Sequence, residues 1–422
     1  MHSFGRGSQI PDESPFRMGC GTAAVPQPNH PMAESNELHR HAIGQHAEWK
    51  PWQVAAILSL TALLALTTLA LLHHGIGKND SFMFRTGATL CGPHLYEYDL
   101  QRKLLGGHDT PYFRAPFYAL LLRPLLRFNF AEALFVLNLA AAGLVILLLP
   151  WSMGKYRYAL SPLIALFIPL ALNFSIEQDG AVVLLVLAVA LLAESCGYPF
   201  VAGAVLALTL EKPTLLLLLP VVILIQKRYR MLWGYLTCAL VLAIVSFWIV
   251  GTAGIRDYAS LVAQYHVVAE KMPTARGIAA TFHAWPIWPA LTIIGGAATT
   301  WAARRTSFKA AFFIGIVGSL FISPQSYAHD CAVLLLPAFY FLCNGSAAQR
   351  TVSALWFIPP LPLAYALSLP WCTLQAGFVG LFLAVLTSQA LGVPQRGVAP
   401  ADATRTPGIP TPQFVLAPRR EA

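Results

Sequence analysis

Apolar segments of nearly the length needed to cross a lipid bilayer recur through most of this 422-residue chain. A membrane-spanning helix needs about 20 predominantly apolar residues, and spans of about 17–25 are observed. Twelve segments approach this length, at 53–73, 130–150, 159–176, 180–196, 198–211, 213–226, 231–252, 285–302, 308–323, 330–345, 351–369 and 371–391. We therefore expect an all-α polytopic membrane protein built on a bundle of about 12 transmembrane helices.

The composition agrees with a chain that is solvated by lipid. Hydrophobic residues make up 56% of the sequence and charged residues only 11%, whereas soluble domains carry about 25% charged residues. So few charges cannot cover the surface of a soluble protein of this length. The net charge is +9, but the basic residues sit in short loops between apolar segments, so we expect no nucleic-acid partner.

The distribution of basic residues orients the bundle, because cytoplasmic loops of membrane proteins carry an excess of Lys and Arg. With the N-terminus in the cytoplasm, the short cytoplasmic loops hold Lys155, Arg157, Lys227, Arg228, Arg230, Arg304, Arg305, Lys309 and Arg350. The short loops on the opposite side hold only Lys212, and the two long loops, 74–129 and 253–284, also lie there. We expect a multi-pass protein of the cell inner (plasma) membrane.

The two ends of the chain differ from the apolar middle. Residues 1–50 are polar, contain several Pro, His and Gly residues, and lack the basic and apolar regions of a signal peptide. Residues 393–422 have a similar composition. We predict disordered cytoplasmic tails at 1–50 and 393–422, on either side of a transmembrane domain at 51–392.

One apolar segment, 114–128, does not fit the alternation of loops. It has only fifteen residues, three of them arginines, and Pro116 and Pro124 limit the continuity of any helix. As a full span it would place the later basic loops outside the cytoplasm. We predict that it forms an interfacial or re-entrant helix within the first external loop, 74–129.

Ionisable and amide side chains collect in the turns that this orientation places outside. They are Asp80, Glu177, Gln178, Asp179, Glu211, Lys212, Gln325, His329 and Asp330. Such groups at helix ends inside a bundle cost several kcal/mol unless they are paired or solvated, which makes them functional candidates.

Each of these residues also has a purely structural interpretation. Asp80, Asp179 and Asp330 each precede an apolar segment and are candidates for helix N-caps. Glu211 and Lys212 are adjacent and can neutralise one another. Polar groups also gather in this way in transporters and channels, so the collection alone does not define an activity.

Three stretches of these external turns carry motifs in a fixed order. The first is DSFMFRTGATLCGPHLYEYD, followed by FRAPFYALLLRPL, and the second is QDGAVVLLVLAVALLAE with VAGAVLALTLEKPTLLLLLP. The third is ISPQSYAHDCAVLLLPAF, with a Ser-Pro, His-Asp and Leu-Leu-Pro pattern, and it is the most specific. Across roughly residues 75–345 the chain resembles glycosyltransferase family 87, the polyprenyl-phosphate-sugar-dependent mannosyltransferases of the GT-C class.

The resemblance implies a GT-C fold whose active site lies at the outer membrane–water boundary. The first external loop supplies the catalytic carboxylate in this class, and by position Asp80 takes that role. The donor implied is a sugar, mannose in this family, carried on polyprenyl phosphate. The acceptor implied is a glycolipid or glycan on the extracytoplasmic face, and the transfer inverts the anomeric centre.

This chemistry assigns roles to the other external residues. A carboxylate within hydrogen-bond reach accepts the proton of the attacking hydroxyl, and cationic groups stabilise the departing phosphate. The candidates for binding the donor phosphate are His329, Lys212 and Arg114. The candidates for binding the donor sugar or the acceptor are Gln178, Asp179, Tyr96 and Asp330.

We expect no cofactor and no metal ion. The sequence has no Gly-rich P-loop and no GxGxxG after a strand, so a nucleotide-sugar donor in a Rossmann-like domain is unsupported. The cysteines are scattered without CxxC or metal-type spacing, and no carboxylate pair marks a metal site.

Two other function classes compete with a transferase. A transporter or lipid flippase would show inverted repeats and helices broken near the midplane, but the halves show no evident repeat and the polar residues gather at one face. A catalytically inactive relative that acts as a membrane scaffold is the other alternative, and Asp80 and His329 argue against it.

Overall fold

The computed structural model describes residues 80–106, 110–148, 161–265, 267–357 and 371–390, with a few positions between 55 and 62. Contacts divide the chain into residues 1–48 and 49–422, and every described residue belongs to the second unit. The predicted tails lie outside the described residues. So do most of the first predicted span, 53–73, and the loop that holds Lys155 and Arg157.

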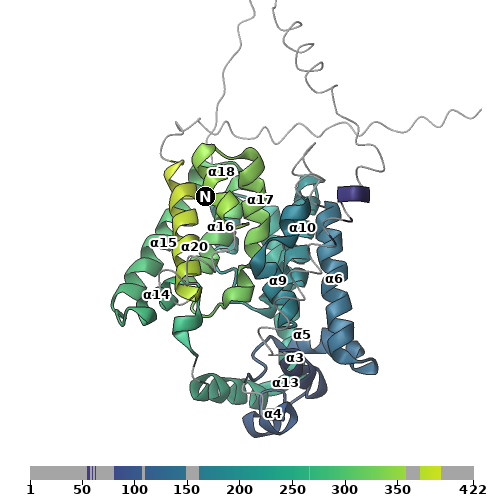
Figure 1. Cartoon of the computed structure of the whole chain (residues 1–422). Helices are drawn as coiled ribbons and strands as arrows, with labels where there is room; N and C mark the ends of the chain where they lie inside the picture. Colours follow the sequence, from purple (N-terminus) through teal and green to yellow (C-terminus); the bar gives the residue numbers. More distant parts are fainter. Residues whose placement is uncertain are drawn as a thin grey trace, which may run out of the picture. The chain divides into compact units, whose positions relative to one another are not determined.

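All regular elements within the described ranges are helical, which confirms the all-α expectation (Figure 1). Their bounds are α3 (Ser81–Thr89), α4 (Tyr98–Leu105), α5 (Pro116–Leu122), η1 (Arg123–Arg127), α6 (Phe130–Leu148), α8 (Ser161–Ala165), α9 (Ile168–Ser175), α10 (Gly180–Ser195), α11 (Pro199–Leu206), η3 (Ala207–Glu211), α12 (Leu219–Ile225), α13 (Tyr229–Gln264), η4 (Ala269–Lys271), α14 (Ala275–Thr281), α15 (Ile287–Arg305), α16 (Phe308–Ile322), η5 (Ala328–Leu334), α17 (Leu335–Asn344), α18 (Ala347–Leu355) and α20 (Trp371–Ser388), where η marks a 3-10 helix. The count of twelve spans and the GT-C arrangement remain predictions.

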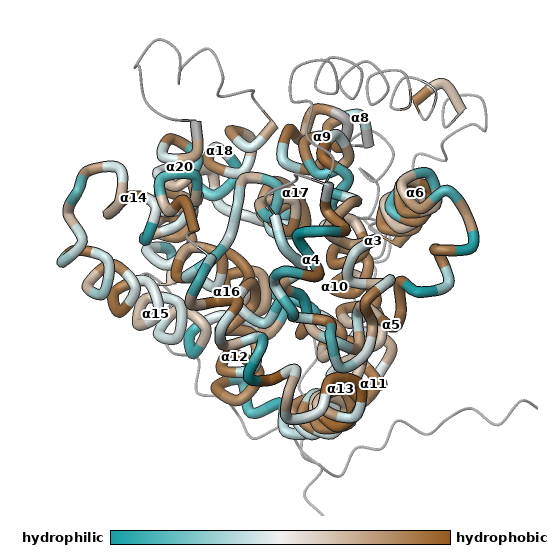
Figure 2. Tube along the Cα trace, turned by 90° about the horizontal axis from the view of Figure 1, so that it is seen from below, coloured by the Kyte–Doolittle hydropathy of each residue, from teal (hydrophilic) through white to brown (hydrophobic). Residues whose placement is uncertain are grey.

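Two helices, α6 and α13, are long and apolar enough to cross a membrane by length and composition. Only 22% of the apolar window of α6 and 11% of that of α13 are buried, so most of their side chains face away from the protein. Trp248 on α13 is 85% exposed and Leu147 on α6 is 65% exposed. Figure 2 shows hydrophobic residues along both helices. Large apolar surfaces of this kind mark contact with lipid or with a partner.

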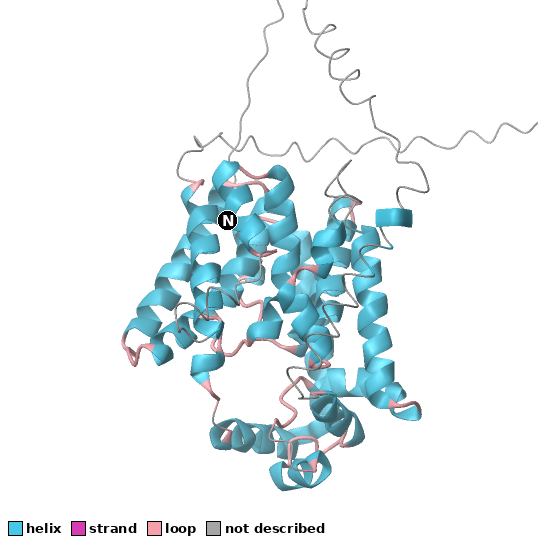
Figure 3. Ribbon diagram, viewed as in Figure 1, coloured by secondary structure: helices cyan, strands magenta, loops and turns pink. Residues whose placement is uncertain are grey.

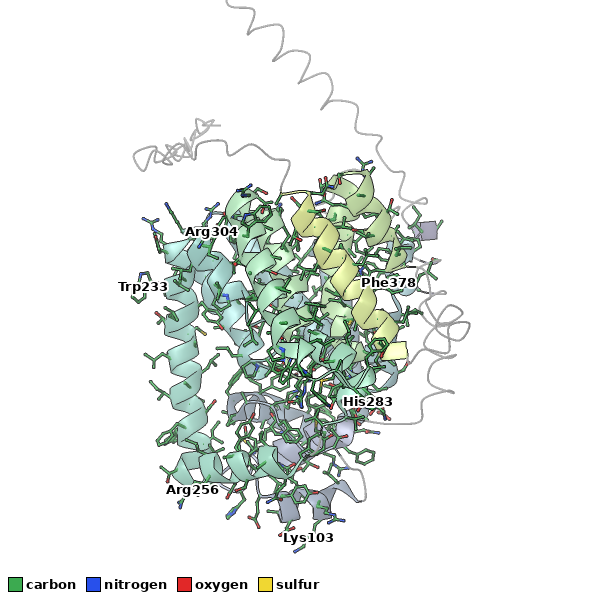
Figure 4. All side chains as sticks on the ribbon, turned by 90° about the vertical axis from the view of Figure 1, so that its left-hand side faces the viewer. Lys103, Trp233, Arg256, His283, Arg304 and Phe378 are labelled. Atoms are coloured by element: carbon green, nitrogen blue, oxygen red, sulfur yellow. The ribbon has the colours of Figure 1, made fainter. Side chains whose placement is uncertain are left out.

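Helix α13 is longer than the span predicted at 231–252. It bends at Gly251, where φ is 61° and ψ is −168°, a backbone conformation that glycine adopts without a steric penalty. The first segment matches the predicted span, and the second lies in the region predicted as a long external loop. Figure 4 shows Trp233 on the first segment and Arg256 near the bend, at the opposite side of the bundle.

Helices α11 and α13 cross at very close range because each has a glycine at the crossing. A Cβ atom on Gly203 would collide with the carbonyl oxygen of Met231, and one on Gly234 would collide with that of Phe200. Small residues that let two backbones approach are typical of helix pairs in membranes.

Several predicted spans are interrupted in the structure. The segment predicted at 159–176 forms α8 and α9, with Pro169 in the first turn of α9. The segments predicted at 198–211 and 330–345 each contain a 3-10 helix, η3 and η5 respectively. Of the segment 213–226, only α12 is helical. The uninterrupted helices that hydropathy predicts are therefore too long in this part of the chain.

The segment 114–128 forms no single long helix. Helix α5 has seven residues, and a 3-10 helix of five residues, η1, follows it with Pro124 in its first turn. This confirms that proline interrupts the segment, whereas its place at a membrane surface remains a prediction. Figure 3 shows α5 at the same end of the bundle as α3 and α4, which belong to the same predicted loop.

Residues of a described basic loop and of the two long external loops lie toward opposite ends of the bundle. In Figure 4, Arg304 and Trp233 lie near one end, whereas Lys103 and Arg256 lie near the other. This separation agrees with an alternating arrangement of the helices.

Candidate functional site

A single guanidinium, that of Arg114, lies at the centre of the polar residues. Its Nη1 atom donates to both carboxylate oxygens of Glu211, at 3.2 and 3.0 Å. Its Nη2 atom donates to Gln178 Oε1 at 3.2 Å and to Asp179 Oδ1 at 3.1 Å. Arg114 therefore joins three turns that are far apart in the sequence.

The amide of Gln178 extends this network to Asp80. Gln178 Nε2 donates to Asp80 Oδ2 at 2.6 Å. The direction of the amide follows from its two neighbours, because a guanidinium has no acceptor and an ionised carboxylate has no donor. The amide oxygen must therefore face Arg114, and the amide nitrogen must face Asp80. Among the described residues, the bond from Gln178 is the one hydrogen bond of the Asp80 carboxylate, so its second oxygen has no donor there.

A second group of charged residues lies at η5 and at Lys212. The ammonium of Lys212 forms an ion pair with Asp330 Oδ2, and the same oxygen accepts a hydrogen bond from the backbone N–H of Tyr327 at 2.7 Å. His329 Nε2 lies 3.7 Å from Asp330 Oδ1. The Asp80 carboxylate interacts electrostatically with the imidazole of His329, so the two groups of charges belong to one site.

Most of this site is withdrawn from solvent. Arg114, Gln178, Asp179 and Glu211 are buried, as are His329 and Asp330, whereas Asp80 is only partly buried. Two cations, Arg114 and Lys212, pair with three carboxyl groups, and Asp80 adds a fourth that binds the Gln178 amide. Among the described residues the site therefore holds no surplus of positive charge, and Asp80 is its most accessible carboxylate.

The backbone fixes the segments that carry these residues. The N–H of Asp80 donates to the carbonyl of Ile176 at 3.0 Å, which ties the first external loop to the Gln178 turn. The N–H of Ala115 donates to the carbonyl of Glu211 at 3.1 Å, which ties the same loop to η3. These bonds bring separate turns together independently of the charges.

Of the three aspartates that were candidates for helix N-caps, only Asp330 makes a capping hydrogen bond. Asp80 and Asp179 occupy N-cap positions, but neither side chain makes a capping hydrogen bond. Asp330 does form a reciprocal cap with Tyr327, as the third residue of η5. Glu211 and Lys212 do not pair with one another, because Glu211 binds Arg114 and Lys212 binds Asp330.

Tyrosines support the Arg114 segment. The hydroxyl of Tyr96 donates to the carbonyl of Arg114 at 2.7 Å, and that of Tyr112 donates to the carbonyl of Ala115 at 3.1 Å. Burial raises the pKa of both phenols above the ordinary value, so both remain protonated donors. Burial opposes the charge of Arg114, but the nearby carboxylates of Asp179 and Glu211 raise its pKa.

The structure thus brings every predicted site residue into one region, although it gives some of them partners of their own. Arg114 and Lys212, predicted to bind phosphate, hold carboxylates, and Tyr96 holds a backbone carbonyl. Sequence reasoning missed Tyr118, whose hydroxyl is buried beside Asp179, because an aromatic residue in an apolar helix gives no polar signal. The roles of the predicted site residues in substrate binding remain predictions.

The chemistry that this arrangement can perform is proton transfer at a positioned carboxylate. Asp80 is an acceptor held by one fixed donor, and His329 lies within electrostatic range of it. Within the described ranges, no group of three or more His, Cys, Asp or Glu side chains is arranged to hold a metal ion.

Comparison with known proteins identifies a family for about half of the chain. The model of glycosyltransferase family 87 matches residues 112–324. The matched region contains Arg114, Gln178, Asp179 and the adjacent pair Glu211 and Lys212. No curated protein and no solved structure matches the chain.

Proposed function

The chain belongs to glycosyltransferase family 87, and from that premise we propose that it transfers mannose from polyprenyl phosphate to an extracytoplasmic glycolipid or glycan. The family and the apolar helices indicate a membrane protein that takes a sugar donor and an acceptor. The proposal adds the donor class, the inverting course of the reaction and the face of the inner (plasma) membrane on which it occurs.

The observation that carries the proposal is the setting of Asp80. Its carboxylate is partly exposed at the edge of a buried polar network, and Gln178 holds one of its oxygens at 2.6 Å. A general base must have a fixed direction and must still be reached by the substrate. Asp80 meets both conditions, whereas the buried carboxylates Asp179 and Glu211 are occupied by Arg114.

In the proposed reaction, an acceptor hydroxyl attacks the anomeric carbon of the donor sugar. The hydroxyl proton passes to the free carboxylate oxygen of Asp80 as the new C–O bond forms. The bond between the anomeric carbon and the phosphate oxygen breaks, and its electron pair leaves with polyprenyl phosphate. Attack from the face opposite the leaving group inverts the anomeric centre.

The groups around η5 are proposed to serve the leaving phosphate. His329 is the first candidate, because it lies at the same site as Asp80 and is not held by a short ion pair. Lys212 can serve only if the incoming phosphate shares it with Asp330. Cationic donors that meet the charge as it develops lower the barrier of such a step.

Replacing Asp80 tests the proposal directly. In membranes that contain the protein, Asp80→Asn should lower transfer of radiolabelled mannose from polyprenyl phosphate by about 10²–10⁴-fold, the usual contribution of a general base. Asp99→Asn is the matched control, since Asp99 is an exposed carboxylate of the same loop, on α4. Normal transfer by the Asp80 variant would remove it as the base. Accumulation of substrate in vesicles without transfer would favour a transporter.

A further inference from the structure

Within the described part of the candidate site, the arginine and the lysine are both already paired with carboxyl groups. Arg114 and Lys212 are both bound to carboxyl groups, and Asp80 adds one more that binds only the amide of Gln178 among the described residues. A phosphate brought to this site adds further negative charge. Binding such a phosphate therefore calls for a nearby cation that no carboxyl group engages.

Arg276, in the first turn of α14, has the required properties. No ion pair engages it in the part of the chain that the structure describes. Its Nη1 atom donates to the carbonyl of Pro324 at 2.8 Å, and its guanidinium carbon lies 5.2 Å from the centre of the Trp288 ring. The side chain is only partly buried, and its Nε atom is buried without a hydrogen-bond partner.

The loop that Arg276 contacts leads directly into the candidate site. Pro324 precedes Tyr327, whose ring stacks on that of His329 with 6.0 Å between ring centres. Arg276 interacts electrostatically with Tyr327. On the other side, Thr214 donates to the carbonyl of Gln325 at 3.3 Å. This loop therefore connects Arg276 with His329 and with the turn that follows Lys212.

The rigidity of this arrangement suits an anion-binding arginine. One Nη atom is fixed on a backbone carbonyl and the guanidinium plane is supported by an aromatic ring, so little side-chain freedom is lost when a ligand binds. A guanidinium offers N–H donors in a fork that matches two phosphate oxygens, whereas an ammonium offers only a point charge.

We propose that Arg276 binds the phosphate of an isoprenyl monophosphate through paired N–H donors, beside His329. This inference rests on the proposed function for the class of donor. Arg276 supplies the positive charge that Arg114 and Lys212 cannot, because both are held in ion pairs. It lies in the long loop 253–284, which has no other proposed role.

Direct binding tests this inference without requiring turnover. The full-length protein in detergent is titrated with farnesyl phosphate, and with farnesol as the uncharged probe. Arg276→Gln should weaken farnesyl phosphate binding about 10–100-fold, as expected for lost hydrogen bonds to a charged group, and leave farnesol binding unchanged. Arg276→Lys should weaken it by at least about 5-fold, because the fork is lost. The control is Arg256→Gln, an exposed arginine of α13, which should bind both probes as the wild type does.

The outcomes separate the inference from the function on which it rests. If the wild type binds farnesyl phosphate better than farnesol and Arg276→Gln does the same, Arg276 is not the phosphate ligand. If Arg276→Gln is too unstable to purify, unchanged affinity in Arg276→Lys overturns the inference. If the wild type does not distinguish the two probes, the proposed donor class fails. Phosphatidic acid in the same micelles is the last probe. If it binds as strongly as farnesyl phosphate and Arg276→Gln weakens that binding, the site belongs to phospholipids instead.

Discussion

The strongest test of the site's architecture is the replacement of Arg114 by methionine, which keeps most of the side-chain volume and removes the charge. The guanidinium makes four hydrogen bonds of 3.0–3.2 Å with Glu211, Gln178 and Asp179. Its side chain is 8% exposed, and those of the two carboxylate partners are 5% and 3% exposed. Arg114→Met leaves two carboxylates buried and uncompensated.

The expected loss of stability is large. Each hydrogen bond to a charged group contributes about 1.5–3 kcal/mol, but the four bonds share one side chain and do not add. Breaking a buried ion pair by removing one partner costs about 3–5 kcal/mol. We take that range for Arg114→Met. It is a large share of the total stability of a folded protein, which is about 5–15 kcal/mol.

The measurement is thermal unfolding of the purified protein in detergent, followed by tryptophan fluorescence. Arg114→Met should lower Tm by roughly 3–6 °C. Arg256→Met removes an exposed arginine of α13 and should change stability by less than about 0.5 kcal/mol. The double variant Arg114→Met with Glu211→Gln should recover at least about 1 kcal/mol, because one uncompensated carboxylate is gone.

Two results would refute this reasoning. A Tm for Arg114→Met within a degree of the wild type would mean that the buried carboxylates do not depend on the guanidinium. A double variant less stable than Arg114→Met alone would mean that Glu211 stabilises the fold through some other contact.

Two further variants test the direction of the Gln178 amide and the close helix crossing. Gln178→Glu keeps an oxygen for the guanidinium but turns a second one towards Asp80, so kcat should fall about 10–100-fold with KM little changed, as for a misplaced catalytic group. The two facing carboxyl groups should also lower Tm. Wild-type kcat would contradict the positioning role. Gly203→Ala should cost about 1–3 kcal/mol of stability through overpacking against α13. Gly143→Ala, on α6 in open space, should be neutral in the same thermal assay.

Hydropathy predicted the bounds of some helices closely and failed where the backbone is bonded to another turn. Helix α6 begins and ends close to the predicted bounds of 130–150, and α16 close to those of 308–323. The span predicted at 198–211 instead ends in η3, whose last residue, Glu211, accepts a backbone hydrogen bond from Ala115. An apolar sequence does not reveal that bond, because its donor lies in a different loop.

The members of the candidate site were visible in the sequence, but their pairing was not. Ionisable residues in external turns stand out because they are costly in a lipid environment. Their partners lie far away in sequence, and even neighbours diverge. Glu211 and Lys212 lie at the end of a 3-10 helix, where successive side chains point about 120° apart. One of them reaches Arg114 and the other reaches Asp330.

The composition of the site also explains why it must open to water. Four carboxyl groups facing two cations would be prohibitively costly in hydrocarbon, because the desolvation of an unpaired charge is not recovered there. Arg114 pairs with Asp179 and Glu211, and Lys212 pairs with Asp330, so each of the three buried carboxyl groups has a cationic partner. The remaining carboxylate, Asp80, is partly exposed. Asp80, which no ion pair engages among the described residues, is therefore the carboxyl group that reaches solvent, as the proposed catalytic base must.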